Sequence, residues 1–154
     1  MAANAKPSRV GLISLGCAKN LVDSEILLGE LERAGHAITA SLDDADTVIV
    51  NTCAFIDEAK RESIDAILEV AARKGRGVGK LLVAGCLVQR HGEDLKREIP
   101  EIDGFVALDQ LREVGSIVQL GGGPPPPAPS HLVFDHTAPR RLTTRGYAYL
   151  KVAE

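Results

Sequence analysis

Short apolar runs alternate with longer segments of helical period along the first 120 residues of the chain. Continuous, β-branched runs are typical of buried strands, and apolar residues at three- and four-residue spacing are typical of helices. The predicted strands are residues 9–15, 36–40, 47–51, 80–84 and 104–107, and the predicted helices are residues 20–34, 57–74, 90–98 and 110–120. This alternation predicts an α/β fold: a doubly wound, flavodoxin-like or Rossmann-like sheet of five mostly parallel strands with helices on both faces.

Composition changes abruptly after this part, where residues 121–130 read GGGPPPPAPS. A flexible Gly run followed by a stiff polyproline stretch offers no core-forming residue, so we predict a linker. The folded domain is expected to span residues 8–120. Residues 131–154 are too few to fold alone, and the extended-looking stretch 147–152 is expected to be the first strand of a second, truncated domain.

The charge balance argues against nucleic acid as a direct partner of this chain. Its 154 residues carry a formal net charge of −3, with three Phe, two Tyr and no Trp. A nucleic-acid surface needs a basic patch or aromatic groups that stack on bases. No apolar run approaches the roughly 18 residues of a membrane span, and the first residues lack the apolar core of a signal peptide. We therefore expect a cytoplasmic protein without membrane contact.

The chain has three cysteines, Cys17, Cys53 and Cys86, and each is expected immediately after a strand and before a helix. Three is an odd number and no Cys-x-x-Cys pair occurs, which argues against a disulfide framework and a zinc ribbon. In a parallel sheet such turns share one edge, outside the carboxyl ends of the strands, where open α/β folds bind ligands. The thiols are therefore expected to converge, and the nearby helix N-termini are expected to lower their pKa values.

Three converging thiolates predict a metal site. Soft thiolates select zinc, copper(I) or iron–sulfur clusters. In a cubane cluster, three ligands leave one iron open to an exogenous molecule, and Gly16 and Gly85 would let the backbone approach so bulky a group. A closed zinc site would need a fourth ligand, for which His91 is the nearby candidate. The alternative is a metal-free domain in which each cysteine is a small buried hydrophobe.

Other polar residues are expected to have ordinary roles. No ligand spacing is present among the four histidines, which are expected on the surface: His36, His91, His131 and His136. Asp23 and Glu25 fall in the first turns of a helix, where the helix dipole favours acids without any catalytic role. Residues 75–80 read GRGVGK, but this stretch follows a helix and precedes a strand, the wrong order for a phosphate-binding loop.

Three segments carry a resemblance to a known family. Residues 14–25 read SLGCAKNLVDSE, residues 51–64 read NTCAFIDEAKRESI, and residues 83–90 read VAGCLVQR. Together they closely resemble the amino-terminal domain of the methylthiotransferases, a family of radical S-adenosylmethionine enzymes, over most of residues 8–120. The first two segments look like the branch that modifies an aspartate of a ribosomal protein. The tRNA-modifying branch more often has Tyr-Gly-Cys-Gln-Met-Asn at the first cysteine.

The resemblance implies a [4Fe-4S] cluster on Cys17, Cys53 and Cys86, whose open iron would hold a sulfur-containing cosubstrate. A second [4Fe-4S] cluster and S-adenosylmethionine would bind to a following domain. Residues 147–154 resemble the segment of the family that leads directly into that domain. The whole enzyme would place a methylthio group on the β-carbon of an aspartate in a small-subunit ribosomal protein. This fragment alone is expected to be catalytically inactive.

Several alternatives remain open on the sequence alone. Asn20, Asn51 and Thr52 flank the cysteines and could donate hydrogen bonds to cluster sulfurs, but loop bracing explains them equally well. The whole protein could be a tRNA-adenosine methylthiotransferase of the same family. The chain could also be a metal-free, flavodoxin-like interaction domain.

Overall fold

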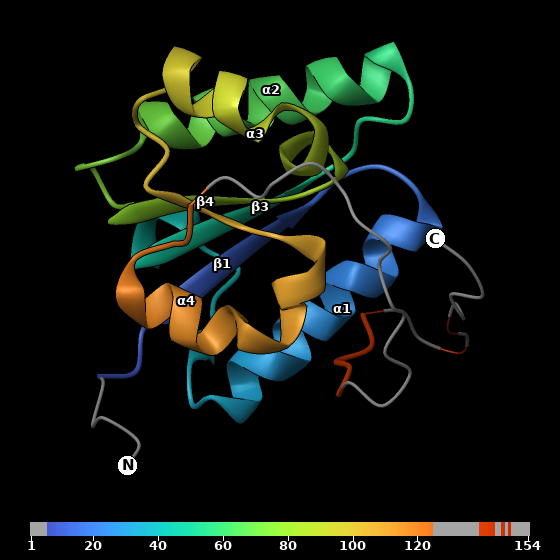
Figure 1. The fold of residues 1–154 in the computed structure, drawn as a ribbon. Helices are drawn as coiled ribbons and strands as arrows, with labels where there is room; N and C mark the ends of the chain where they lie inside the picture. The colour runs from blue at the N-terminus through green and yellow to red at the C-terminus, as the bar shows by residue number, and fades with distance from the viewer. Residues whose placement is uncertain (1–5, 125–138, 144–145, 147, 149–154) are drawn as a thin grey trace.

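The computed structural model describes residues 6–124, 139–143, 146 and 148 (Figure 1). Its centre is a five-stranded sheet in the order β2-β1-β3-β4-β5, in which all neighbouring strands run parallel. The strands are β1 (Arg9–Ser14), β2 (Ala37–Ile38), β3 (Thr47–Thr52), β4 (Lys80–Gly85) and β5 (Gly104–Val106). This order confirms the predicted parallel α/β sheet, with every strand inside or within one residue of its predicted range.

Helices cover both faces of the sheet, as a doubly wound fold requires. The α-helices are α1 (Ala18–Arg33), α2 (Asp57–Ala72), α3 (Cys86–Glu98) and α4 (Val114–Leu120), and the 3₁₀ turns are η1 (Leu42–Asp44) and η2 (Leu108–Glu113). Figure 1 shows α2 and α3 on one face and α1 and α4 on the other. Within the described ranges, no helix has the length and apolarity that crossing a membrane requires.

Strand β3 illustrates how the apolar run builds two cores. All six of its residues are buried. Val48 and Val50 belong to the core beneath α2 and α3, whereas Ile49 faces the other way and belongs to the core that includes Leu27 of α1. Side chains alternate across a strand, so a strand buried on both faces must be apolar at successive positions.

Helix α3 begins earlier than the apolar period indicates. The prediction places its start at Arg90, but the helix begins at Cys86, with a kink at His91 (φ −133°, ψ 21°). Gly85 has a φ of +94° and turns β4 directly into the helix, so no separate loop is needed. Helical period is hard to detect in this first turn because Leu87 and Val88 also fit a continuation of the strand.

His36 is buried, contrary to the predicted surface position, with 4% of its area exposed. Its Nδ1 accepts a hydrogen bond from the backbone N–H of Ser8 (3.2 Å), so Nε2 carries the proton and donates to the carbonyl of Gly115 (3.1 Å). The ring therefore joins the start of β1 to α4. His91 is partly exposed, whereas His131 and His136 lie outside the described residues.

The beginning of the predicted linker is attached to the sheet. Gly121 follows α4 with a φ of +85°. Gly123 and Phe105 of β5 then exchange two backbone hydrogen bonds of 2.8 and 3.1 Å. The remainder of the predicted linker, residues 125–130, lies outside the described residues, as do most of residues 131–154.

Candidate metal centre at the carboxyl ends of the strands

The three cysteines follow three neighbouring strands. Cys17 is the N-cap residue of α1, three positions after the end of β1. Cys53 comes directly after β3, and Cys86 comes directly after β4 as the first residue of α3. Since Ser14 pairs with Asn51 and Thr52 pairs with Gly85, the ends of these parallel strands are nearly level. The thiol-bearing residues therefore share the carboxyl edge of the sheet.

The turns that carry the cysteines pack tightly because two of them contain glycine with positive φ. Gly16 has a φ of +90°, and a Cβ there would lie 2.5 Å from the Cβ and 2.8 Å from the Sγ of Cys53. A Cβ on Gly85 would lie 2.3 Å from the carbonyl oxygen of Thr52. Only glycine permits both the backbone conformation and these approaches.

The three thiols differ in their exposure and environment. Cys17 is exposed, Cys86 is partly buried, and Cys53 is buried with 4% of its area exposed. Burial raises the pKa of the Cys86 thiol, and the neighbouring Cys53, Asp23 and Cys17 raise it further, while the positive charge of Lys19 lowers it. The expected lowering of the pKa is therefore wrong for Cys86, because desolvation by burial is the largest influence on its thiol. A metal bound here would have to displace the thiol proton.

Two asparagines brace the turn before α1. The Nδ2 of Asn20 donates to the carbonyl of Leu15 and to that of Asn51 (3.1 Å). The Nδ2 of Asn51 in turn donates to the carbonyl of Asn20 (3.1 Å) and to the Oγ of Ser24 (2.8 Å). Both N–H groups of each amide are thus used within the protein, and neither amide keeps a hydrogen for a cluster sulfur.

Hydroxyl groups brace the other two turns in the same way. The Oγ1 of Thr52 donates to the carbonyl of Ala84 (2.5 Å), which joins the end of β3 to the end of β4. The Oγ of Ser63 in α2 accepts from the backbone N–H of Cys53 (3.0 Å) and donates to its carbonyl (2.9 Å). The backbone on either side of the Cys53 thiol is thereby held in one position.

The donor set fits an iron–sulfur cluster better than a closed zinc site. Among the described residues, no three or more His, Cys, Asp or Glu side chains are gathered closely enough to hold a metal ion. Zinc would draw its thiolates to about 2.3 Å from one point. A four-iron cluster is a wider body than a zinc ion, and three soft thiolates along one edge of the sheet are the type of ligand that it needs. The buried Oδ1 of Asn20, which has no hydrogen-bond partner within the described part, is a free acceptor at this edge.

Two large apolar side chains next to Cys53 are exposed, which the sequence pattern does not reveal. Phe55 is 85% exposed and Ile56 is 53% exposed. They lie in the turn between β3 and α2, at the same edge as the thiols. Exposed aromatic and aliphatic groups beside a candidate site are typical of a surface that another domain or molecule covers.

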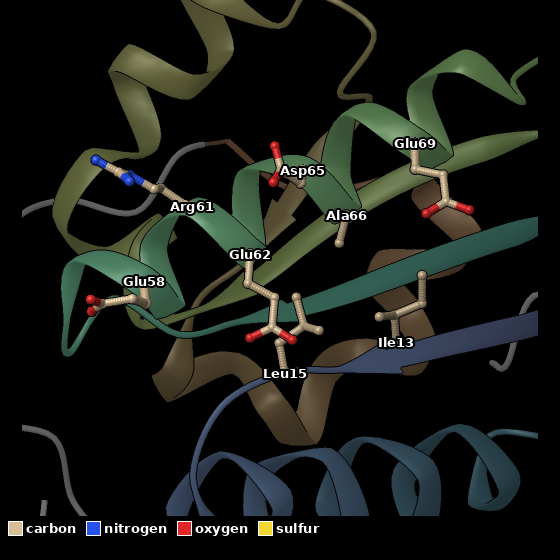
Figure 2. A pocket seen from close by; sticks show the side chains of 8 residues that line it. All are labelled: Ile13, Leu15, Glu58, Arg61, Glu62, Asp65, Ala66 and Glu69. Carbon is tan, nitrogen blue, oxygen red and sulfur yellow. The ribbon is translucent and has the colours of Figure 1, made fainter.

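A hollow of about 600 Å³ lies between α2 and the end of β1 (Figure 2). Figure 2 shows an apolar floor of Ile13, Leu15 and Ala66 and a charged rim along α2. The rim consists of Glu58, Arg61, Glu62, Asp65 and Glu69. Four carboxylates and one guanidinium give the rim a formal charge of −3, which repels phosphate groups. No cysteine lines this hollow, so it is separate from the candidate metal centre.

The acidic residues near the start of α1 are buried rather than solvated. Asp23 and Glu25 are each 2% exposed. The carboxylate of Glu25 is bound by Arg140 and Thr143, from the segment beyond the predicted linker. Sequence reasoning missed this pairing because 115 residues separate Glu25 from Arg140.

The chain is similar to known proteins over most of its length. The family described as "Uncharacterized protein family UPF0004" matches residues 9–107. Proteins named "Ribosomal protein uS12 methylthiotransferase RimO" are similar to this chain: that of Solibacter usitatus is 48% identical over 95% of the chain, and that of Symbiobacterium thermophilum is 49% identical over 97%. That of Desulforudis audaxviator is 54% identical over 75% of the chain. The chain spans 32%, 32% and 26% of the length of these relatives, which is between a quarter and a third.

Proposed function

This chain belongs to the family described as uncharacterized protein family UPF0004, and from that premise we propose that it is the amino-terminal part of a methylthiotransferase that modifies ribosomal protein uS12. Relatives of 48–54% identity bear that name, which supports the proposal. The activity belongs to the longer protein, because the chain spans only between a quarter and a third of the length of those relatives. No observation on this chain favours tRNA as the substrate, and the negative rim along α2 disfavours it there.

Cys17, Cys53 and Cys86 are the proposed ligands of a [4Fe-4S] cluster. The observation that carries this assignment is their position after three adjacent parallel strands, at one edge. When bound, the cluster would supply an iron without a protein ligand, open to a sulfur-containing cosubstrate. Gly16 and Gly85 keep the backbone compact at the edge, and Ser63 fixes the backbone of Cys53.

Asn20, Asn51 and Thr52 are proposed to brace the ligand turns rather than to donate to cluster sulfurs. Their side-chain N–H and O–H hydrogens are all used by protein acceptors. Buried polar groups that are fully satisfied make their surroundings rigid, which keeps three thiols in register before a metal arrives.

The rest of the reaction is assigned to the part of the protein beyond this chain. There we place the second [4Fe-4S] cluster and S-adenosylmethionine, and the methylthiolation of the β-carbon of an aspartate of uS12 in the cytoplasm. Residues 8–120 are the proposed cluster domain, residues 121–130 the linker, and residues 131–154 the start of the next domain. The 154-residue chain by itself is expected to have no transferase activity.

Anaerobic reconstitution of the chain with iron and sulfide tests the ligand assignment. We expect about four irons and four sulfides per chain, with loss of most of that iron in each of C17A, C53A and C86A. H91A is the matched control, because a zinc site of three thiols and an imidazole would need His91. One zinc per chain that depends on His91, or no metal in the folded wild-type chain, would contradict the cluster.

The full-length protein tests the substrate. Incubation with S-adenosylmethionine and a sulfur source is expected to add a methylthio group to uS12 in small ribosomal subunits, detected by mass spectrometry of the protein. C17A in the full-length enzyme is expected to abolish the transfer. Modification of tRNA instead of uS12 would replace the ribosomal-protein proposal with the alternative branch of the family.

A further inference from the structure

The segment of residues 139–143 lies against the middle of α1 (drawn in red in Figure 1). The carboxylate of Glu25 is its principal contact. One oxygen, Oε2, pairs with the guanidinium of Arg140 (2.5 Å), and the other, Oε1, accepts from the backbone N–H (2.9 Å) and the hydroxyl (3.0 Å) of Thr143. Glu25 is 2% exposed, so this ion pair lies beneath the surface.

The backbones of the segment and the helix also meet directly. The N–H of Arg141 donates to the carbonyl oxygen of Glu25 (3.0 Å). A Cβ on Gly29 would lie 2.6 Å from the carbonyl oxygen of Pro139. Glycine is unfavourable in a helix interior compared with alanine, so its presence in the middle of α1 suits a place where another backbone must approach.

Both the charge of Glu25 and the lack of a side chain at Gly29 match the segment of residues 139–143. The carboxylate is met by one cation and two hydrogen-bond donors, and the helix offers a bare backbone surface one turn further on, at Gly29. A second, exposed ion pair joins Arg141 to Glu32 (2.5 Å) on the same helix. Contacts at Glu25, Gly29 and Glu32 follow one another at three- and four-residue spacing, which places them on one face of α1.

We propose that Glu25 and Gly29 form an internal docking site for residues 139–143, which anchors whatever follows in the protein to the helix that begins beside Cys17. Glu25 lies eight residues after Cys17, or about 12 Å along the helix axis. The chain that continues past the docked segment is thereby held near the cysteine edge, which is the carboxyl edge of the sheet where Cys17, Cys53 and Cys86 lie. The docking site is independent of the cluster, since none of its contacts involves a cysteine.

Amide hydrogen exchange by NMR on the metal-free 154-residue chain tests the docking site. The N–H groups of Arg141 and Thr143 are expected to exchange slowly in the wild type, because both are donated to Glu25. In G29A, E25Q and R140Q they are expected to exchange about tenfold faster or more, while the amides of Ile49 and Leu82 in the core strands stay protected. E32Q, which affects only the exposed pair, is the control. It is expected to change the exchange rates of the Arg141 and Thr143 amides by about threefold at most.

G29A gives the decisive outcome, because alanine is the better residue for a helix interior and the variant is expected to fold. If the amides of Arg141 and Thr143 exchange as slowly in G29A as in the wild type, the proposal of a docking site is wrong. Equally, free exchange of both amides in the wild type would overturn it. If E25Q fails to fold, G29A and R140Q still decide. Because no iron is present, failure of cluster assembly in the reconstitution experiment is a separate result that leaves the docking site untouched.

Discussion

Helix α1 contributes to two buried polar regions of opposite character. At its start, Asn20 and Ser24 join Asn51 in a network of neutral amides and hydroxyls that bond to backbone groups and to one another. Further along the helix, Glu25 carries a charge and is bound by Arg140 from a distant part of the chain. Ser24 of the neutral network and Glu25 of the ion pair are adjacent residues on the helix.

The difference shows what each kind of group is suited to do. Neutral groups bonded to the backbone fix the course of local turns without adding charge of their own. The charges that act on the Cys86 thiol come from other side chains, such as Lys19 and Asp23. A buried carboxylate must find a partner, because an unpaired charge away from water is costly. Glu25 therefore specifies the position of a chain segment, whereas Asn51 specifies the shape of a turn.

The sharpest test of the turns is G85A. An added Cβ would lie 2.3 Å from the Thr52 carbonyl oxygen, and alanine is unfavourable at a φ of +94°. We expect a loss of about 3 kcal/mol or more in the free energy of unfolding, measured by urea denaturation. G35A is the matched control: its φ is +88° but nothing lies within 4 Å, so about 1 kcal/mol is expected. Equal losses would show that close packing at the turn contributes nothing.

The neutral network is tested next by N51A. Asn51 is 1% exposed and donates to the carbonyl of Asn20 and the hydroxyl of Ser24. Its removal is expected to cost about 2–3 kcal/mol in urea denaturation, because buried partners are left unsatisfied. T39A, which removes an exposed hydroxyl bonded to Ser41, is the control and is expected to cost well under about 1 kcal/mol. If N51A leaves the free energy of unfolding nearly unchanged, water must satisfy the hydrogen-bonding groups that Asn51 leaves behind.

The ion pair is tested by pH. Burial alone would raise the pKa of Glu25, but hydrogen bonds from Thr143 and Arg140 and the charge of Arg140 outweigh it, and the pKa is lowered. A lowered pKa stabilises the folded state above the usual glutamate value of about 4.3, and this contribution is lost as the pH falls through the lower, folded value. At pH 7, the wild type is therefore expected to unfold at a higher urea concentration than E25Q. This difference should shrink below about pH 4. A difference that grows in acid would contradict the pairing.

The smallest effect is expected for the exposed pair of Glu32 and Arg141. Both side chains are 47% exposed, so solvent screens their charges. E32Q is expected to change the free energy of unfolding by about 0.5 kcal/mol or less, with no acid dependence like that of E25Q. An effect as large as that of E25Q would mean that exposed charge, rather than burial, holds the segment.

Local pattern predicted the elements well and their ends less well. The strand at β3 is clear in the sequence, because five of its six buried residues are apolar or β-branched and only Asn51 is not. The start of α3 at Cys86 was missed because a strand that passes directly into a helix through Gly85 leaves no polar cap to mark the boundary. His36 was misplaced because its two partners, Ser8 and Gly115, lie 28 and 79 residues away.

Local patterns in the sequence were enough to predict the parallel sheet, and with it the common edge that Cys17, Cys53 and Cys86 follow. Periodicity and the position of a residue at the end of a strand are local properties. In a parallel sheet the carboxyl ends of the strands lie at one edge, so residues that follow them lie at the same edge. The pairing of polar groups, such as Glu25 with Arg140, and the burial that raises the pKa of Cys86 became visible in the folded chain. Pairing and desolvation depend on distances between residues far apart in the chain, for which the sequence carries no periodic signal.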